Sequence, residues 1–556
     1  MAPHFPIDHL AEMAVDAARL SGRSLSLAAR EVLLASALAT AIATLLVALG
    51  PPAGDGAAHL YRTELVREGA IVWDALWYGG HYPLASYSLL FYLPSALVGP
   101  TLVALIAAIA SAALFATLAV REWGEAACWP ARTFAVLVCA SLFTGTYAYA
   151  AGIAAALGSL VLIQRGRLWL ALACAALAAG FSPLAFGFLC LVLLAAAIVK
   201  RPPFRPLAGF AIGLALVAAM LVTIAALFPA EGRYDFRGRE LAWALVACGL
   251  VATIAWRARR GRVLCAVCLL LGGACVLAYF VDSPIGSNLT RFRAYVFPFA
   301  LLAATLVAFR PRWLTFPALI AACFYSLSPY LAVATQLTDT RPATETFWTS
   351  TVDVIRDRAG PDFRVDVVPT FDNWEAYHVA AAGIPIARGW YRQLDLARNP
   401  LLYDTKLNGP QYRAWLRSLG VKLVVLPLAP LDRVGAEPQA SLLRSGRSGL
   451  VQVARTAEAV VYEVPNATPI LTGPGAVRLT AFDHELIAGE VGSSGRYVLR
   501  VPYTPFLAVR AGSVCLERGA AGMTSLVARR GGSFELGVPG AGELARIAFG
   551  ARPSAC

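Results

Sequence analysis

Long apolar runs separated by short polar segments dominate the first 335 residues of the chain, and the pattern then changes. A run of about twenty mainly apolar residues is long enough to cross a bilayer as a helix. The pattern predicts about eleven such helices over 31–335, after a polar, cytoplasmic segment at 1–30. They are expected at 31–50, 98–119, 132–148, 149–164, 168–183, 184–199, 207–228, 240–256, 263–281, 293–309 and 313–333.

Shorter apolar segments follow in the rest of the chain. "FRVDVVP", "VKLVVLP" and "AVVYEVP" have the composition of strands, and stretches of helical character lie between them. This alternation predicts an α/β module over 336–468. From 469 to 556, apolar and polar residues alternate between glycine-rich turns, which predicts a β-sandwich. The expected fold is a polytopic α-helical membrane protein that carries these two modules at its C-terminal end.

The composition agrees with a membrane protein. Of 556 residues, 58% are hydrophobic and 15% are charged, whereas soluble domains are about a quarter charged. The net charge of +13 includes many Lys and Arg residues in short segments between apolar runs. It therefore indicates membrane topology and not a nucleic-acid partner. With the N-terminus inside, sixteen of these residues face the cytoplasm and seven face outward, so the C-terminal modules are expected outside.

The eleven cysteines divide into two groups. Nine lie in or beside apolar runs, where a cysteine is most simply a small core residue. Cys515 and Cys556 lie in the polar C-terminal part, which is expected in an oxidising compartment. A disulfide between these two residues is one expectation, and two free thiols too far apart to pair are the alternative.

The stretch "GDGAAHLYRTELVREG" interrupts the apolar pattern after the first predicted helix, in an outer loop expected over 51–97. Asp55 can cap a short helix here. Within that helix Asp55, His59 and Arg62 stand at i, i+4 and i+7, and therefore share one face. The stripe is either a functional group of carboxylate, imidazole and guanidinium, or a capping residue with a solvated face.

Aromatic and polar residues follow in the same loop. They include Trp73, Asp74, His81, Tyr82 and Tyr87. Aromatic side chains are common at membrane interfaces, but aromatic faces with polar edges also suit sugars. A substrate-binding surface is one expectation for these residues, and an ordinary interfacial belt is the other.

Arginines in the predicted outer loops are candidates for binding a phosphate. They are Arg62, Arg237, Arg291 and Arg293. A guanidinium group can bind phosphate through two parallel hydrogen bonds. Arg291 also follows "SPIGSN", whose backbone N–H groups could face an anion. The alternative is contact with solvent or with lipid headgroups.

A second dense polar stretch, "DNWEAYHVAAAGIPIARGWYRQLDLARNP", lies in the predicted α/β module. It includes Arg388, Trp390 and Arg392. These side chains are expected to contact an acceptor substrate. The alternative is a polar network that joins the module to the membrane domain.

This arrangement resembles the GT-C superfamily of integral membrane glycosyltransferases. The resemblance rests on a first helix followed by an outer loop that opens with Asp-x-x-x-His, an aromatic "G-x-x-P-L-x-x-Y" segment, many helices and an outer C-terminal domain. The matching residues are Asp55, His59, Arg62, Gly79, Gly80, Pro83, Leu84 and Tyr87. Within the superfamily, the chain resembles bacterial membrane proteins related to 6-pyruvoyl-tetrahydropterin synthase and those that decorate lipoteichoic acid.

The resemblance implies an inverting glycosyltransferase of the bacterial cytoplasmic membrane. Such an enzyme moves a sugar from a polyprenyl-phosphate donor to an extracytoplasmic envelope glycan or lipid acceptor. It implies that Asp55 is the catalytic carboxylate, with His59 beside it as an orienting partner or a contact to the sugar. A positioned carboxylate can take the proton that an acceptor hydroxyl loses as it attacks.

Two further questions stay open at this stage. The outer loops contain no close Asp-x-Asp pair, so no obligatory metal or other cofactor is expected, although Asp55 with another carboxylate could hold a divalent cation. A lipid or polysaccharide transporter or flippase is the main alternative function, and a non-catalytic envelope-assembly protein is another. A transporter typically carries ionisable residues near the membrane midplane, whereas the charges here lie in predicted loops.

Overall fold

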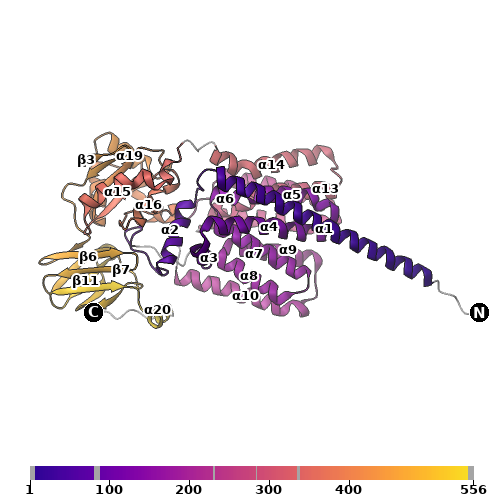
Figure 1. Ribbon diagram of the computed structural model, residues 1–556, viewed down its shortest axis with the longest axis horizontal. Helices are drawn as coiled ribbons and strands as arrows, with labels where there is room; N and C mark the ends of the chain where they lie inside the picture. The colour runs from indigo at the N-terminus through magenta and orange to yellow at the C-terminus, as the bar shows by residue number, and fades with distance from the viewer. Residues whose placement is uncertain (1–6, 81–87, 229–231, 284, 335–338, 549–556) are drawn as a thin grey trace, which may run out of the picture. The chain divides into compact units, whose positions relative to one another are not determined.

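A computed structural model describes residues 7–80, 88–228, 232–283, 285–334 and 339–548 (Figure 1). The chain forms two compact units. Unit 1 comprises Met1–Pro51, Val98–Leu221 and Tyr234–Gln336, and unit 2 comprises Pro52–Leu97, Val222–Arg233 and Leu337–Cys556. The predicted outer loop at 51–97 thus belongs almost entirely to the unit that contains the C-terminal modules.

Unit 1 is helical. Its elements include α1 (Ile7–Leu49), α4 (Pro100–Trp123), α5 (Cys128–Val138), α6 (Ala140–Thr144), α7 (Tyr147–Gln164), α8 (Leu168–Phe181), α9 (Pro183–Lys200), most of α10 (Phe204–Leu227), α11 (Gly238–Trp256), α12 (Arg262–Phe280), the 3₁₀ segment η4 (Gly286–Tyr295), α13 (Val296–Leu306) and α14 (Arg312–Ala334). Among the described residues, eight helices are long and apolar enough to cross a membrane. The predicted count of about eleven spans stays a prediction.

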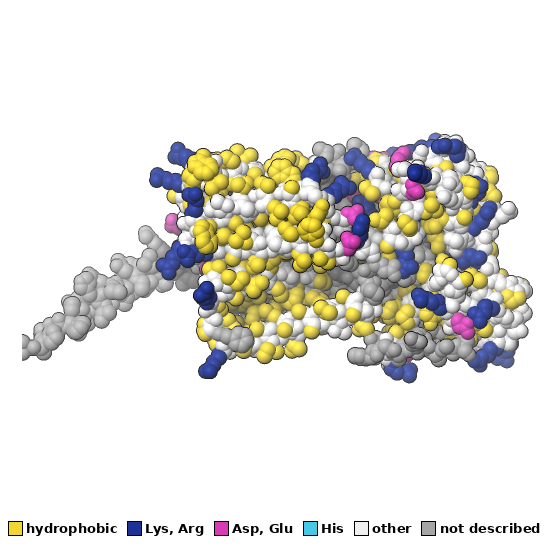
Figure 2. Space-filling view, turned by 180° about the vertical axis from the view of Figure 1, so that it is seen from behind, with side chains coloured by type: hydrophobic (Ala, Val, Ile, Leu, Met, Phe, Trp, Pro, Cys, Tyr) yellow, Lys and Arg dark blue, Asp and Glu magenta, His cyan; other side chains and the backbone are white. Residues whose placement is uncertain are grey.

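The outer surface of these helices is apolar. Trp169, Leu216 and Phe280 are each more than 60% exposed, and hydrophobic side chains cover the sides of the helices in Figure 2. Lys and Arg side chains gather at the helix ends, as in the exposed Arg201 and Arg259. Because water does not favour so much exposed apolar surface, the helices of unit 1 belong in a lipid bilayer.

Small residues and a buried ion pair help to fix the helices of unit 1 against one another. A Cβ atom added at Gly152 in α7 would lie 2.7 Å from Cβ of Ala185 and 2.9 Å from Cβ of Ser182, at the start of α9. Such close approach is typical of helices packed within a membrane. Glu31 in α1 is fully buried and accepts two hydrogen bonds, of 2.7 and 2.8 Å, from Arg132 in α5.

The α/β part of unit 2 is built on a four-stranded sheet with the order β1-β2-β4-β3. The strands are β1 (Arg364–Val367), β2 (Val421–Pro427), β3 (Val451–Arg455) and β4 (Ala459–Glu463). The helices of this part are α15 (Glu345–Ala359), α16 (Glu375–Ala381), α17 (Arg392–Arg398), α18 (Gly409–Leu419) and α19 (Glu437–Arg444). β1 and β2 are parallel, and the other pairs are antiparallel. The three strand-like segments of the sequence are therefore β1, β2 and β4.

Two further antiparallel sheets follow, with the orders β10-β11-β8-β5 and β6-β7-β12-β9. Their strands are β5 (Leu471–Thr472), β6 (Val477–Asp483), β7 (Leu486–Val491), β8 (Gly495–Pro502), β9 (Ala508–Ala511), β10 (Val514–Arg518), β11 (Met523–Ala528) and β12 (Gly532–Gly537), and α20 (Ala541–Ala548) comes after them. Along β8 the buried residues alternate with more exposed ones, as strands with one buried face require. Cys515 in β10 is disulfide-bonded. Its predicted partner, Cys556, lies outside the described residues, so that pairing stays a prediction.

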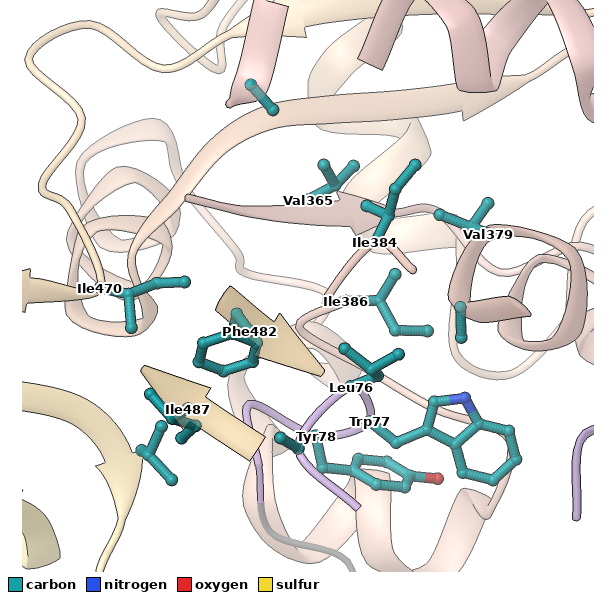
Figure 3. Packing of buried hydrophobic residues seen from close by; sticks show 14 of the residues in the cluster. Leu76, Trp77, Tyr78, Val365, Val379, Ile384, Ile386, Ile470, Phe482 and Ile487 are labelled. Carbon is teal, nitrogen blue, oxygen red and sulfur yellow. The ribbon is translucent and has the colours of Figure 1, made fainter. Parts of the chain in front are cut away.

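The segment after α2 (Gly56–Arg67) is built into the core of unit 2. The backbone N–H of Ile386 donates to the carbonyl of Leu76 at 2.8 Å, and Ile386 is in turn bridged to Val365 of β1. Leu76, Trp77 and Tyr78 are buried in one hydrophobic cluster with residues of the α/β sheet and of the β6–β7 hairpin (Figure 3). This part of the predicted outer loop therefore acts as a structural element of unit 2.

Candidate functional site

The first candidate residue, Asp55, lies directly before α2. It occupies the N-cap position of this helix, as expected, but its side chain makes no capping hydrogen bond to the helix. Its backbone carbonyl accepts a hydrogen bond of 3.2 Å from the N–H of His59, in the first turn. Asp55 is half-buried. Side-chain capping of α2 therefore does not account for this carboxylate.

His59 is the second residue of the predicted stripe. It is 1% exposed, and its Nδ1 lies 3.2 Å from the hydroxyl oxygen of Tyr92 in α3 (Tyr92–Val98). The edge of its ring also packs on Phe91, with 5.4 Å between ring centroids. The expected solvated face is thus a buried face that packs against α3.

Arg62, the third residue, is 3% exposed. Its Nη1 donates to the hydroxyl of Tyr391 at 2.9 Å, and its guanidinium carbon lies 4.7 Å from the centroid of the Tyr92 ring. A guanidinium over an aromatic face is stabilised electrostatically, and more strongly when water is excluded. Tyr92 contacts both His59 and Arg62, so the three side chains form one ordered group.

A second carboxylate, that of Asp372, lies near Asp55. Asp372 and Asn373 both have left-handed backbones, with φ of 65° and 54°, a conformation that costs a non-glycine residue about 1–2 kcal/mol. The next residue, Trp374, packs on the start of α2, since a Cβ atom added at Gly56 would lie 3.0 Å from its ring. The segment that carries Asp372 is thereby held against the residue that follows Asp55.

The pKa of Asp372 reflects this environment. Burial raises it to about 7, and the negative charges of Asp55 and Asp432 contribute, while the charge of Arg392 acts in the opposite direction. Two carboxylates that repel one another in this way resist simultaneous ionisation. Perturbed carboxyl groups of this kind are frequent at functional sites.

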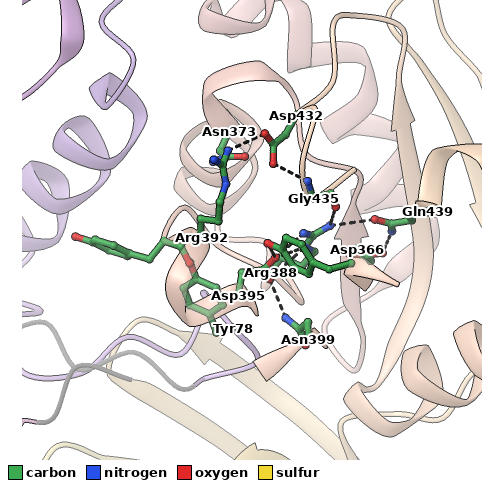
Figure 4. A network of polar contacts seen from close by, with 12 residues as sticks. Tyr78, Asp366, Asn373, Arg388, Arg392, Asp395, Asn399, Asp432, Gly435 and Gln439 are labelled. Atoms are coloured by element: carbon green, nitrogen blue, oxygen red, sulfur yellow. Dashed lines mark hydrogen bonds and ion pairs between the residues drawn. The ribbon is translucent and has the colours of Figure 1, made fainter. Parts of the chain in front are cut away.

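Arg392 and Trp390, two predicted substrate-binding residues, lie beside this pair. Arg392 is exposed and forms an ion pair of 2.7 Å with Asp432, whose other oxygen accepts from the N–H of Gly435 at 2.9 Å (Figure 4). The carbonyl of Trp390 accepts from the side chain of Asn373 at 3.4 Å. The indole N–H of Trp390 has no hydrogen-bond partner within the described part of the chain.

Three other predicted substrate contacts are occupied inside the protein. Arg388 is 4% exposed and binds Asp395, Gln439 and the carbonyl of Gly435. This buried network (Figure 4) lies within the α/β part of unit 2, and the alternative of a network that joins this module to the membrane domain stays a prediction. Burial and the charge of Asp395 act in opposite directions on the pKa of Arg388, and the net effect is to raise it.

Trp73 and Asp74 are also internal. The indole N–H of Trp73 donates to the carbonyl of Gly80 at 3.1 Å, and the side chain is 1% exposed. Asp74 is fully buried and accepts hydrogen bonds from the hydroxyl of Tyr61 at 3.0 Å and the N–H of Leu76 at 3.1 Å. Neither side chain presents a surface to a ligand, because its polar atoms bind the protein itself.

The remaining arginine candidates belong to unit 1. Arg237 is exposed and precedes α11, and the carbonyl of Arg293 accepts from the hydroxyl of Ser326 at 2.7 Å. Arg291 is half-buried in η4, with its guanidinium carbon 5.9 Å from the centroid of the Tyr149 ring. The basic candidates are therefore divided between the two units.

A cavity of about 160 Å³ lies within unit 1. Its lining is hydrophobic and comes from α4, α5, α7, α9, α12, η4 and α13. Phe292, the neighbour of Arg291, lines it together with Phe188, whose ring packs edge-on against Tyr149 at 6.1 Å. An apolar cavity thus lies next to the segment that carries Arg291.

The other predictions concern aromatic residues and metals. His81, Tyr82 and Tyr87 lie outside the described residues, so their predicted roles stay predictions. Within the described ranges, no group of three or more His, Cys, Asp and Glu side chains is arranged to hold a metal ion. The prediction that no metal is obligatory is untested.

Comparisons with known proteins find matches among solved structures. No protein-family model matches the chain, and no curated protein sequence matches it. Eleven chains of solved structures match. One is ArnT from Cupriavidus metallidurans in the apo state, with a TM-score of 0.39, 14% sequence identity, and coverage of 74% of this chain and 93% of that chain. A similarity at this level carries no argument about function.

Sequence reasoning missed the partners of the stripe. Asp372 and Tyr391 lie in the dense polar stretch that the sequence indicates, but their proximity to Asp55 and Arg62 arises from contacts across more than 300 positions of the chain. Tyr92 belongs to the same run of aromatic residues, and nothing in the local pattern distinguishes it from its neighbours. The useful signal was the density of polar and aromatic residues in two separate segments, because these two segments pack together in unit 2.

Proposed function

We propose that the protein is an inverting membrane glycosyltransferase of the GT-C type. It moves a sugar from a polyprenyl-phosphate donor to an envelope glycan or lipid acceptor on the outer side of a bacterial cytoplasmic membrane. The observation that supports the proposal is the position of the Asp55 carboxylate. It lies at the N-cap position of α2 without a side-chain hydrogen bond to the helix, and it lies within electrostatic reach of the half-buried carboxyl group of Asp372.

Asp55 acts as the general base in this proposal. The acceptor oxygen forms a bond to the anomeric carbon of the sugar while its proton passes to Asp55. The bond between that carbon and the donor's phosphate oxygen breaks, and polyprenyl phosphate leaves with the bonding electrons. The positive end of the α2 dipole favours the ionised, proton-accepting form of Asp55.

Arg62 stabilises the phosphate group in this proposal, and Arg291 of unit 1 keeps its predicted role as a candidate for binding the donor. Negative charge grows on the leaving phosphate, and cationic groups aimed at it lower the barrier. Arg62 is held by Tyr391 and Tyr92 in a site from which water is largely excluded. Arg291 lies next to the apolar cavity of unit 1, whose hydrophobic lining suits an isoprenoid chain.

His59 and the exposed residues around Asp372 have supporting roles. The contact of His59 with Tyr92 orients the aromatic ring that packs on Arg62. Trp390 and Arg392 are the acceptor contacts that we favour, because neither is fully buried. His81, Tyr82 and Tyr87 are proposed to complete the substrate-binding surface.

Replacing Asp55 tests the proposal. A strain that lacks the protein is complemented with the wild type, with Asp55→Asn, or with Asp353→Asn as a control, since Asp353 is an exposed carboxylate on α15. Loss of a positioned general base lowers transfer by about 10²–10⁴-fold. The Asp55 variant should therefore lose the envelope modification at unchanged membrane levels, and the control should keep it.

Other outcomes separate the alternatives. If the envelope glycan changes in the deletion strain but Asp55→Asn restores it fully, the catalytic assignment is wrong. A transporter or an assembly protein would then explain the phenotype better. Direct transfer by the purified protein, from a polyprenyl-phosphate sugar to an envelope acceptor, distinguishes an enzyme from both alternatives.

A further inference from the structure

The hairpin between β6 and β7 is attached to the segment that follows α2. The N–H of Ala75 donates to the carbonyl of His484, at the tip of the hairpin, over 2.7 Å. The carboxylate of Glu485 accepts hydrogen bonds from the N–H groups of Val72 at 2.9 Å and Trp73 at 3.4 Å. The hairpin tip therefore binds this segment through both backbone and side chain.

His484 is placed between two carboxylates. Its Nδ1 lies 3.1 Å from Oδ1 of the fully buried Asp74, and its Nε2 lies 3.0 Å from Oε2 of Glu68, just after the end of α2. The hydroxyl of Tyr61, on α2, lies 3.4 Å from the same Nδ1 and donates to the other oxygen of Asp74. The imidazole thus connects the hairpin to the C-terminal end of α2 and to the segment beyond it.

The protonation state of His484 decides how many of these contacts form hydrogen bonds. A neutral imidazole carries one N–H donor, whereas an imidazolium carries two. Only the protonated ring can donate to Asp74 and Glu68 at once. When the ring is neutral, one of the two carboxylates loses its donor.

The surroundings favour the protonated ring. Burial by itself lowers the pKa of His484, but the hydrogen bond to Asp74 and the negative charges of Asp74, Asp483 and Glu68 outweigh burial and raise it above its ordinary value. These carboxylates and the hydroxyl of Tyr61 are the titratable groups that face the ring from the hairpin, from α2 and from the segment after it.

We propose that His484 attaches the β6–β7 hairpin to α2 and to the segment after it, and that the strength of this attachment depends on pH. In acid the imidazolium binds both carboxylates, and the hairpin is held tightly. As the pH rises through the transition, the ring loses its proton and its charge, so both ion pairs are lost, one hydrogen bond to a carboxylate remains, and the attachment loosens. Since α2 also carries His59 and Arg62, the pH on the side of the membrane where unit 2 lies adjusts how firmly this helix is held.

Hydrogen exchange of the full-length protein in nanodiscs tests the proposal. The readout is protection of the peptides that contain Ala75 and His484 between pH 5.5 and 8.5, corrected for the intrinsic dependence of exchange on pH. We expect protection to fall as the pH rises. One pH unit of separation between the bound and released pKa corresponds to about a tenfold change in the opening equilibrium.

Three variants make the test specific. His484→Gln should remove the pH-dependent part of the change, because glutamine does not titrate in this range. Glu68→Gln should move the midpoint to lower pH, because one negative charge beside the ring is removed. His378→Gln is the matched control: His378 lies in α16, and burial lowers its pKa, so the fall at the hairpin should persist in that variant.

The opposite results would overturn the proposal. Protection that depends on pH equally in the wild type and in His484→Gln would show that another group controls the attachment. A protonation midpoint of His484, measured by nuclear magnetic resonance on ¹³C-labelled histidine, at or below that of a free histidine would do the same. The chain has six histidines, so the resonance that disappears in His484→Gln can be assigned.

Discussion

Arg388 and Arg392 lie four positions apart in the chain, but their side chains differ in exposure to solvent. Arg388 is 4% exposed and binds Asp395 inside the α/β part of unit 2. The side chain of Arg392 is 44% exposed and pairs with Asp432 at the surface. Removing one partner of a buried ion pair leaves an uncompensated charge, which is far more costly than the loss of an exposed pair.

Replacing each arginine by methionine tests this difference. Arg388→Met should lower the free energy of unfolding by about 3–5 kcal/mol, even though Tyr403 and Asn399 still donate to Asp395. Arg392→Met should lower it by about 1 kcal/mol or less. Thermal unfolding of the purified protein measures both. Equal losses of stability would contradict the assignment of Arg388 to a structural network.

Asp372 gives a prediction about pH. Its pKa is raised to about 7 when folded, against about 3.9 for a free aspartate. The folded state therefore binds this proton more tightly than the unfolded state does. The resulting stabilisation is fully present below about pH 3.9, declines as the pH rises, and is lost above about pH 7.

Asp372→Asn removes this titration. The unfolding temperature of the variant relative to the wild type should rise between pH 4 and pH 8, because only the wild type must bury a charged group near Asp55 at the higher pH. Asparagine also tolerates the left-handed backbone of this position, so the pH dependence is the informative quantity and not the absolute difference. A pH-independent difference would mean that Asp372 does not titrate in this range.

Among the elements, the membrane helices were the easiest to predict. The expected helix at 168–183 is Leu168–Phe181, and the one at 207–228 is Phe204–Leu227, because apolar length alone defines such segments. The expected helix at 132–148 is instead divided into α5 and α6. Continuous hydrophobicity does not report a break in backbone geometry, so this division could not be read from the pattern.

Packing between elements was harder to predict. The helical register placed Asp55, His59 and Arg62 on one side of α2, but it did not show that His59 and Arg62 are buried. Trp73 and Trp77 have the composition of an interfacial belt, yet they are core residues of unit 2. The distinction depends on strands and helices several hundred positions away, which local patterns do not encode.

The contact between α7 and α9 leads to a prediction about helix packing. Gly152→Ala places a methyl group within 3 Å of Ala185 and Ser182, which should cost about 1–3 kcal/mol through overpacking. Gly187 lies in α9, and no atom of the described residues lies within 4 Å of a Cβ added there. Gly187→Ala should therefore be neutral or slightly stabilising, because alanine favours helix more than glycine does.

Thermal stability in a single detergent compares the two glycine variants. Their substitutions are identical and both residues lie in membrane helices, so a general effect of added hydrophobicity would appear in both. If Gly187→Ala is as destabilising as Gly152→Ala, close helix packing at Gly152 is not the cause.

For the whole molecule, the number of membrane crossings determines the side on which unit 2 lies. Sixteen basic residues against seven favour an inside N-terminus. An odd number of crossings then places the chain after residue 336 outside, and an even number places it inside. The eight helices that meet the length and hydropathy criterion would place this part of the chain inside. About eleven crossings, with shorter helices such as α8 included, would place it outside.

Labelling with a membrane-impermeant maleimide decides between the two topologies. Ser441 is exposed in α19 of unit 2, and Arg259 is exposed between α11 and α12. In intact spheroplasts, Ser441→Cys should react and Arg259→Cys should react only after lysis. The wild type reports the background from native thiols, which is expected to be small because the nine free cysteines of the described chain are buried or half-buried. If neither variant reacts before lysis, as eight crossings from an inside N-terminus require, unit 2 lies in the cytoplasm. That result would also remove the extracytoplasmic acceptor from the proposed reaction, because Asp55 belongs to the same unit.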